Sequence, residues 1–293
     1  MKFNILYLIQ ISFFKAIILI DEFLYLIFKK NFKYNLASFL NKELIVKKKI
    51  KTKSLILYSP SKLIKWRIDT LFSKEPKTLE WIDNFEKYVD KPIFWDIGSN
   101  IGLYSIYAAI DNSNTKVISF EPSPSNLSIL SKNISFNNLE ERIFICQNPI
   151  TKKESDYFKF VESSIEPGNS INTLISEEAN GLILDKSGKK LNYYLFSNSL
   201  NYFIKNSILE IPNFIKIDVD GNEHEILEGA RAFLDNKKIV SILVEIDDNK
   251  TKNKNEIIDL TSKHGFEIKQ KDRLTSDESS NFYHTYNYIF FKK

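Results

Sequence analysis

The sequence predicts a doubly wound α/β fold, in which helices cover both faces of a mostly parallel sheet. From about residue 76, short β-branched or aromatic runs alternate with segments of helical apolar spacing. The last two apolar runs have no helical pattern between them, which indicates an antiparallel C-terminal hairpin at one edge of the sheet. The first thirty residues are strongly apolar and indicate a helical N-terminal extension.

The composition is sufficient for one large domain with an extension. The chain has 293 residues, of which 43% are hydrophobic. Its net charge of +4 is the small difference between 41 basic and 37 acidic residues, which argues against a dedicated nucleic-acid binder. The basic run at 47–53 is explained more simply as a solvated edge or linker. Cys146 is the only cysteine, so neither an intramolecular disulfide nor a cysteine-based zinc site is expected, and a cytoplasmic location fits.

The apolar N-terminal segment has three possible uses. No uninterrupted apolar run is long enough to span a bilayer comfortably, and no small-residue cleavage site of a signal peptide follows. We therefore expect one or two helices with a wide apolar surface. Docking onto the main domain is favoured, because burial within the molecule is the commoner fate of such helices. Self-association or peripheral membrane binding through residues 1–30 remains open, with three lysines close by: Lys29, Lys30 and Lys33.

The first half of the predicted sheet begins at residue 93. Residues 93–98, 116–121 and 142–147 are expected to be buried strands. The run at 103–110 has helical spacing, so it connects the first two strands. Ser123 offers an N-cap and Pro124 a first-turn residue, and they open a helix that runs to about residue 137.

The second half of the sheet follows a segment longer than an ordinary crossover. Between residues 150 and 212 we expect a short strand near 156–161, then irregular structure, then a helix at 199–206. Two further buried strands are expected, at 213–221 and 239–247. Asn222 and Glu225 form a capping box, which predicts a helix that runs to about residue 234. A further helix is expected to be capped by Asn253 and Glu256 and ended by Gly265. The last element is the hairpin of 266–270 with 286–292.

The turn after the first strand, within "FWDIGSNIGLYS" (94–105), is the most informative stretch. A dinucleotide site would have G-x-G-x-x-G here, but Asn100 stands at the middle glycine. Asp96 places a carboxylate beside the turn, which would repel a phosphate and could attract a cation. No G-x-x-x-x-G-K-[ST] motif occurs, so a P-loop is excluded.

Glu121 ends the second strand and is the second anchor of a nucleoside site. A carboxylate there can accept both hydroxyls of a ribose, as in sites for NAD and for S-adenosylmethionine. A turn that disfavours phosphate, together with a ribose-binding acid, favours a nucleoside without phosphates that carries an amino-acid ammonium. S-adenosylmethionine fits this description.

Four successive motifs resemble those of FkbM-type methyltransferases: "FWDIGSNIGLYS", "VISFEPSPSN", "FIKIDVDGNEHEILEGA" and "ILVEID". The resemblance spans about residues 92–247 and implies a class I, Rossmann-like fold with S-adenosylmethionine as cofactor. It also implies methyl transfer to oxygen, often to a hydroxyl of a sugar or another natural product. Residues 1–75 have no part in it, so we expect a helical extension at 1–75 and a methyltransferase domain at 76–293.

The resemblance also suggests cofactor-binding residues. Asp96, Gly98 and Gly102 would line the methionine end, and Glu121 would hold the ribose. The remaining candidates are two residues of the same turn and two near the adenine: Ser99, Asn100, Gln147 and Asn148. Pro149 departs from the small residue expected near the adenine.

Catalytic candidates gather after the fourth and fifth strands. A sugar hydroxyl is a poor nucleophile, so a general base or a metal must assist its loss of a proton. Asp218 is the preferred catalytic residue; Asp220 could instead cap a turn, and His224 could be a solvated surface residue. Glu245 ends the adjacent strand, and the carboxylates could also bind a divalent cation.

The acceptor class and two rival functions stay open. We expect a glycan, a lipid-linked saccharide or a small-molecule hydroxyl as acceptor, and no nucleic acid. One rival is an NAD-dependent oxidoreductase, and the other is a non-catalytic scaffold that uses the apolar N-terminal segment at a membrane surface.

Overall fold

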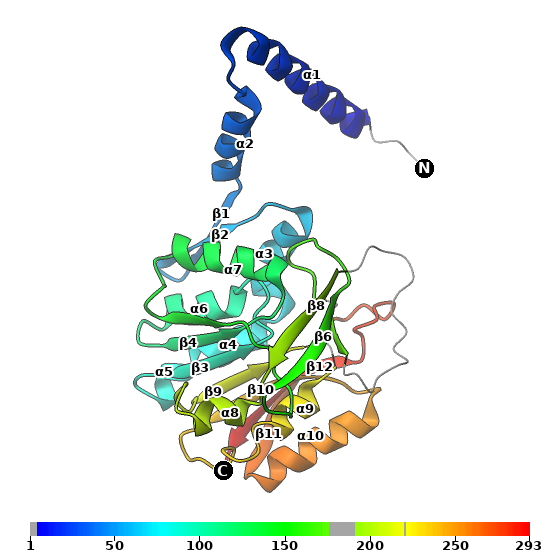
Figure 1. Cartoon of the computed structure of the whole chain (residues 1–293). Coiled ribbons are helices and arrows are strands. Elements are labelled where there is room, and N and C mark those ends of the chain that lie inside the picture. The colour runs from blue at the N-terminus through cyan, green and yellow to red at the C-terminus, as the bar shows by residue number, and fades with distance from the viewer. Residues whose placement is uncertain (1–4, 171, 176–190, 220) are drawn as a thin grey trace. The chain divides into compact units, whose positions relative to one another are not determined.

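The computed structural model describes residues 5–170, 172–175, 191–219 and 221–293 (Figure 1). By its internal contacts the chain divides into two compact units, Met1–Ile45 and Val46–Lys293. This division lies earlier than the boundary expected at residue 75. The reason is that residues 46–75 supply buried side chains to the core of the second unit, among them Leu55, Ile64 and Ile68.

The first unit consists of two helices, α1 (Ile5–Phe28) and α2 (Phe32–Glu43), which contact each other. Asp21 of α1 is buried; its Oδ1 accepts a hydrogen bond of 2.7 Å from the backbone N of Lys33, and its Oδ2 lies 3.5 Å from Lys33 Nζ. Large apolar side chains of α1 are exposed, including Phe13, Leu19 and Leu26. Among the described residues, we find no helix with the length and apolarity that a membrane crossing requires.

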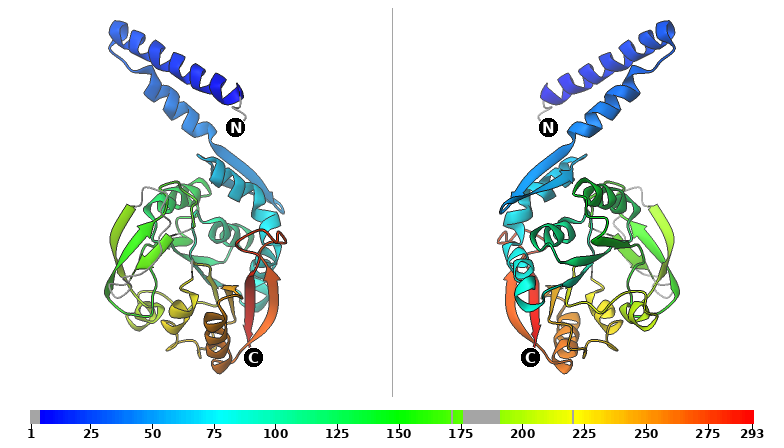
Figure 2. Two further views of the ribbon diagram at one scale, coloured as in Figure 1. Left: turned by 90° about the vertical axis from the view of Figure 1, so that its right-hand side faces the viewer. Right: turned by 90° about the vertical axis from the view of Figure 1, so that its left-hand side faces the viewer.

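A seven-stranded sheet is the centre of the second unit, with the order β11-β12-β10-β9-β3-β4-β5. Its strands are β3 (Ile93–Ile97), β4 (Lys116–Phe120), β5 (Ile143–Cys146), β9 (Phe214–Ile217), β10 (Ser241–Asp247), β11 (Phe266–Arg273) and β12 (Thr285–Lys292). The first five of these are parallel, whereas β11 and β12 form an antiparallel hairpin on the β10 edge, coloured orange and red in Figure 2. The predicted fold class is therefore confirmed.

Helices cover both faces of this sheet, and each face has its own apolar core. One core includes side chains from α3 (Lys62–Lys74), α4 (Pro76–Asp83), α5 (Phe85–Tyr88), α6 (Leu103–Asp111) and α7 (Pro124–Phe136). The other includes side chains from α8 (Leu200–Lys205), α9 (Glu223–Glu228) and α10 (Thr251–Lys263). This arrangement leaves the carboxyl ends of the parallel strands as the place where loops from both faces meet.

Two small sheets lie outside the central one. One is the pair β1 (Ile45–Ile50) and β2 (Lys53–Tyr58), formed where the sequence suggested a solvated edge or linker. The other is an antiparallel sheet of β6 (Asp156–Glu162), β7 (Asn172–Ile175) and β8 (Leu191–Ser197), in the order β7-β6-β8. The expected strand near 156–161 is confirmed. The expectation of irregular structure after it is wrong for β7 and β8, because both pair with β6.

The helix caps predicted from the sequence are confirmed for α7 and wrong for α9 and α10. Ser123 caps α7 as predicted, since its Oγ accepts a hydrogen bond of 3.3 Å from Asn126 N. The capping box at Asn222 is wrong: its side chain makes no capping bond, and Glu223 Oε1 instead accepts from Gly221 N at 2.9 Å. Helix α9 also ends at Glu228 rather than near residue 234, and α10 begins at Thr251, before the predicted cap Asn253.

Candidate active site

A cavity of about 520 Å³ opens at the carboxyl ends of β3, β4, β9 and β10. This is where an open α/β sheet binds its ligands. Residues of each of these strand ends line it: Gly98 after β3, Glu121 after β4, Asp218 after β9 and Glu245 in β10. Three of the four are acids, so this side of the cavity favours a ligand group that carries positive charge.

The turn after β3 is held against both neighbouring strands. The backbone N–H groups of Gly98 and Ser99 both donate to Phe120 O at 3.0 Å, which ties the turn to the end of β4. Gly98 has φ of +83°, and a Cβ there would lie 1.9 Å from the backbone O of Asp218. Only glycine therefore allows β3 and β9 to approach so closely beside the cavity.

Asn100 occupies the middle position of the same turn and also lines the cavity. It has a left-handed backbone with φ of +52°, which asparagine tolerates better than most residues. Its Oδ1 accepts from Ile101 N at 2.9 Å, and its Nδ2 donates to Asn169 O at 3.1 Å. Asn100 is thus a structural residue of the turn as well as a wall of the cavity.

Glu121 is buried and holds the turn by its carboxylate. Its Oε2 accepts from Asn100 N at 2.8 Å, and its Oε1 accepts from Ser123 N at 2.8 Å. Each carboxylate oxygen has a second lone pair, so two ligand hydroxyls could still donate to it. Burial raises the pKa of Glu121 to about 7, although these backbone hydrogen bonds act in the opposite direction.

Asp96 and Gly102, both expected to touch the cofactor, are not among the residues that line the cavity. Asp96 is buried below the turn, where its Oδ2 accepts from Ser105 Oγ at 2.6 Å; its Oδ1 has no hydrogen-bond partner within the described part of the chain. Gly102 precedes α6 with φ of +83°, and a Cβ there would lie 2.3 Å from Leu130 Cδ1. In this structure both residues fix the packing of α6.

The remaining predicted cofactor residues divide in the same way. Asn148 lines the cavity, and its Nδ2 donates to Phe196 O at 2.9 Å. Gln147 is exposed and does not line it, whereas the unexpected Pro149 does. Ser99 is buried and lines a smaller neighbouring pocket together with Asp218.

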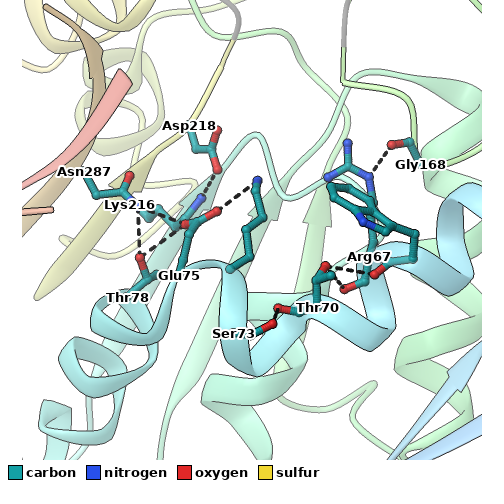
Figure 3. Close-up of polar contacts among 11 residues, drawn as sticks. Arg67, Thr70, Ser73, Glu75, Thr78, Gly168, Lys216, Asp218 and Asn287 are labelled. Carbon is teal, nitrogen blue, oxygen red and sulfur yellow. Dashed lines mark hydrogen bonds and ion pairs between the residues drawn. The ribbon is translucent and has the colours of Figure 1, made fainter. Parts of the chain in front are cut away.

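A buried cluster of charges supports the end of β9 (Figure 3). Lys216 is fully buried, and its Nζ donates to Asp218 Oδ2 at 2.5 Å. Burial alone would lower the pKa of Lys216, but Asp218, Asp96 and Glu75 together raise it. Burial alone would raise the pKa of Asp218, but Lys216, with Lys74 adding to it, lowers it. Both members of the pair therefore stay charged.

Glu245 faces the cavity from β10 in a different environment. Burial raises its pKa well above the ordinary value, and the negative charges of Asp218 and Glu75 raise it further. Two carboxylates thus share one cavity with pKa values displaced in opposite directions. Such pairs are typical of catalytic sites, because one carboxylate stays charged while the other exchanges its proton at a higher pH.

Of the other two catalytic candidates, His224 is described by the structure and does not line the cavity. Asp220 lies outside the described residues. His224 is half-buried between two acids: its Nε2 lies 3.9 Å from Glu228 and its Nδ1 lies 3.6 Å from Glu256. Among the described residues, no group of three or more histidines, cysteines or acids is placed to hold a metal ion.

One wall of the cavity was not expected from the sequence. Helix α3 lines it with four side chains on one face: Leu63, Trp66, Arg67 and Lys74. Their spacing of three, four and eleven residues from Leu63 is the signal that a helical face would give. It was missed because the basic and apolar pattern of α3 also fits a surface helix, and because α3 precedes the motifs that carry the resemblance.

The fold and the site define a Rossmann-like α/β protein with a cavity at the carboxyl ends of its parallel strands, lined there by acids. The family follows from comparison: the model of the methyltransferase FkbM domain matches residues 96–268. Because that match covers more than half of the chain, the chain belongs to the FkbM methyltransferase family, as the four motifs predicted.

Two curated relatives and one solved structure illustrate the likeness. The chain is 28% identical over 162 residues to the methyltransferase sdnD of Sordaria araneosa, covering 47% of this chain and 60% of that protein. It is 25% identical over 181 residues to the hexuronic acid methyltransferase AglP of Haloferax volcanii, covering 62% and 65%. The chain thus spans less than two thirds of the length of these relatives. An FkbM methyltransferase from Methylobacillus flagellatus superposes with a TM-score of 0.46 at 14% identity, covering 78% of this chain and 53% of that one.

Proposed function

We propose that the protein is an S-adenosylmethionine-dependent O-methyltransferase that acts on a hydroxyl of a sugar or glycan. The observation that carries this proposal is the cavity at the strand ends, which Glu121, Asp218 and Glu245 line together. Membership of the FkbM family supports methyl transfer as the reaction.

The residues present fit S-adenosylmethionine. Glu121 is the acid at the end of the second parallel strand and retains lone pairs for two ribose hydroxyls. Gly98, Asn100 and Asn148 line the same cavity and would surround the nucleoside and the methionine. The acidic walls would also suit the ammonium and the sulfonium of this cofactor. When bound, the cofactor supplies a methyl group on a sulfonium centre for in-line displacement by the acceptor oxygen.

Glu245 would act as the general base. The acceptor hydroxyl must lose its proton when its oxygen is methylated, and the Glu245 carboxylate would take that proton. The raised pKa makes this carboxylate a stronger base than an exposed glutamate. Glu245 can accept a proton only in its deprotonated form, so the fraction of active enzyme should rise with pH.

Asp218, the preferred catalytic residue in the sequence, takes a different role in this proposal. Its ion pair with Lys216 keeps it deprotonated, which makes it a poor proton acceptor. It would supply a fixed negative charge beside the reaction centre and keep the pKa of Glu245 high. His224 and Asp220 carry no step of this mechanism.

A sugar acceptor is supported by one relative, since AglP of Haloferax volcanii is named a hexuronic acid methyltransferase. The experiment that tests the proposal is thermal unfolding of the purified protein with S-adenosylmethionine and, separately, with NAD. A ligand at about a hundred times its dissociation constant should stabilise the fold by roughly 2.7 kcal/mol. Stabilisation by NAD alone would favour the oxidoreductase, and no stabilisation by either ligand would favour the scaffold.

Turnover would then be measured with radiolabelled S-adenosylmethionine and simple glycosides. Label that survives mild alkali would be an ether on a hydroxyl, as proposed. Label that mild alkali releases would be a methyl ester on a carboxylate and would contradict the hydroxyl assignment.

A further inference from the structure

Helix α3 has one face that packs in the apolar core and another that lines the cavity. Ile64, Ile68 and Leu71 are buried in the core of the second unit. The neighbouring face, with Trp66 and Arg67, lines the cavity. Because the buried face fixes the position of the helix, it also fixes where the side chains of the other face lie in the cavity wall.

Trp66 is an exposed aromatic surface on this wall. Trp66 has half of its residue surface exposed to solvent, whereas Trp81 and Trp95 are buried. Phe282, which is also exposed, lines the same cavity from the segment before β12. Aromatic rings at the mouth of a pocket pack well against the apolar C–H face of a pyranose ring.

The two cations of this wall, Arg67 and Lys74, affect the pKa values of acids at the proposed reaction centre. Lys74 and Arg67 both lower the pKa of Asp218, and Lys74 also lowers that of Glu245. Arg67 is oriented by a hydrogen bond of 2.5 Å from its Nε to Gly168 O (Figure 3). Lys74 Nζ lies 3.2 Å from Glu75 Oε1. The cavity is therefore polarised, with acids at the strand ends and cations on α3.

We infer that α3 is the acceptor-binding wall and that the acceptor is an anionic saccharide, whose ring packs on Trp66 and whose carboxylate or phosphate faces Arg67 and Lys74. This inference rests on the proposed function, since it assigns the strand-end acids to the cofactor and the base. Glu245 lines the same cavity, so an acceptor held on α3 would share that cavity with the proposed base.

Trp66 provides a direct readout, because the other two tryptophans are buried. The full chain, loaded with S-adenosylhomocysteine to prevent turnover, would be titrated with three probes while tryptophan fluorescence is followed. The probes are methyl β-D-glucuronoside, glucose 1-phosphate and methyl β-D-glucoside. We expect the two acidic probes to bind about tenfold more tightly than the neutral one, as a hydrogen-bonded charge pair would give. Their relative affinities distinguish a carboxylate from a phosphate.

The matched variants are R67Q, K74Q and K65Q, each of which removes one positive charge from α3. Lys65 is exposed, is ion-paired with Asp69 and does not line the cavity, so K65Q should keep the preference for acidic probes. R67Q or K74Q should reduce that preference severalfold while binding of S-adenosylhomocysteine is unchanged. W66F should lose most of the signal.

Three results would overturn the inference: equal affinity for acidic and neutral probes, no fluorescence response to any probe, or an equal loss of preference in K65Q. Failure of the proposed function is recognised separately, because it would appear as absent binding of S-adenosylmethionine and S-adenosylhomocysteine. Binding of both cofactor forms without an anion preference would leave the methyltransferase proposal standing and reject only the acceptor wall.

Discussion

Lys216 Nζ lies 2.5 Å from Asp218 Oδ2, and the two residues stand at the end of the same strand, β9. Lys216 also lies 4.8 Å from the centre of the Tyr104 ring, so its ammonium is enclosed on several sides. A fully buried cation so close to the cavity is costly unless a carboxylate remains beside it. Asp218 is therefore both a stabilising partner of Lys216 and a wall of the proposed active site.

The variant D218N should destabilise the protein because it leaves Lys216 with a weaker set of partners. We expect a loss of about 3 kcal/mol in the free energy of unfolding, measured by urea denaturation. The double variant K216M/D218N removes both charges and should recover part of that loss. If D218N unfolds at the same urea concentration as the wild type, the buried pair is not important for stability.

The variant E245Q should lower kcat by about a hundredfold or more, because the proposed proton acceptor is lost. Its dissociation constant for S-adenosylmethionine should change little. In the wild type, kcat should rise with pH as Glu245 is deprotonated, and this pH dependence should vanish in E245Q. D247N is a suitable control, since Asp247 ends the same strand without lining the cavity. Full activity in E245Q would remove Glu245 from the mechanism.

Affinity for S-adenosylmethionine should depend on the charge of Glu121. Its pKa is raised to about 7, and ribose hydroxyls donate more strongly to the ionised form. Binding should therefore be weaker at pH 6 than at pH 8 and should release a proton, measured by calorimetry in buffers of different ionisation enthalpy. E121Q should bind more weakly and lose the pH dependence. Unchanged affinity in E121Q would contradict the ribose assignment.

Two glycine variants should differ sharply although both positions have positive φ. In G98A the new Cβ would meet the backbone O of Asp218 at 1.9 Å, so β3 and β9 must move apart. We expect loss of cofactor binding together with a lowered Tm. In G265A nothing lies within 4 Å of the Cβ, so only the backbone penalty of roughly 1–2 kcal/mol remains. Similar Tm values for the two variants would argue against the close approach at Gly98.

The sheet and one side of the site could be predicted because their signals are local. The β-branched runs gave the five parallel strands, and the fixed position of the first turn placed Gly98, Asn100 and Glu121 at one edge. The approach of Trp66 and Arg67 could not be predicted, because it depends on how α3 packs against the core rather than on nearby residues. The opposite pKa shifts of Asp218 and Glu245 could not be predicted either, because burial raises the pKa of Glu245 and the buried Lys216 lowers that of Asp218.

The expectation of a membrane-surface role for residues 1–30 leads to a final prediction. Helix α1 exposes large apolar side chains, and Lys29, Lys30 and Lys33 follow at its end, a combination that favours anionic lipid surfaces. If this role is correct, the full chain should sediment with phosphatidylglycerol-containing vesicles more than with neutral ones. Replacing Lys29, Lys30 and Lys33 by Gln should weaken that binding, while Lys237 and Lys238, changed to Gln in the second unit, serve as the matched control. Docking or self-association would instead leave the protein in the supernatant with both kinds of vesicle, and a concentration-dependent mass would then identify self-association.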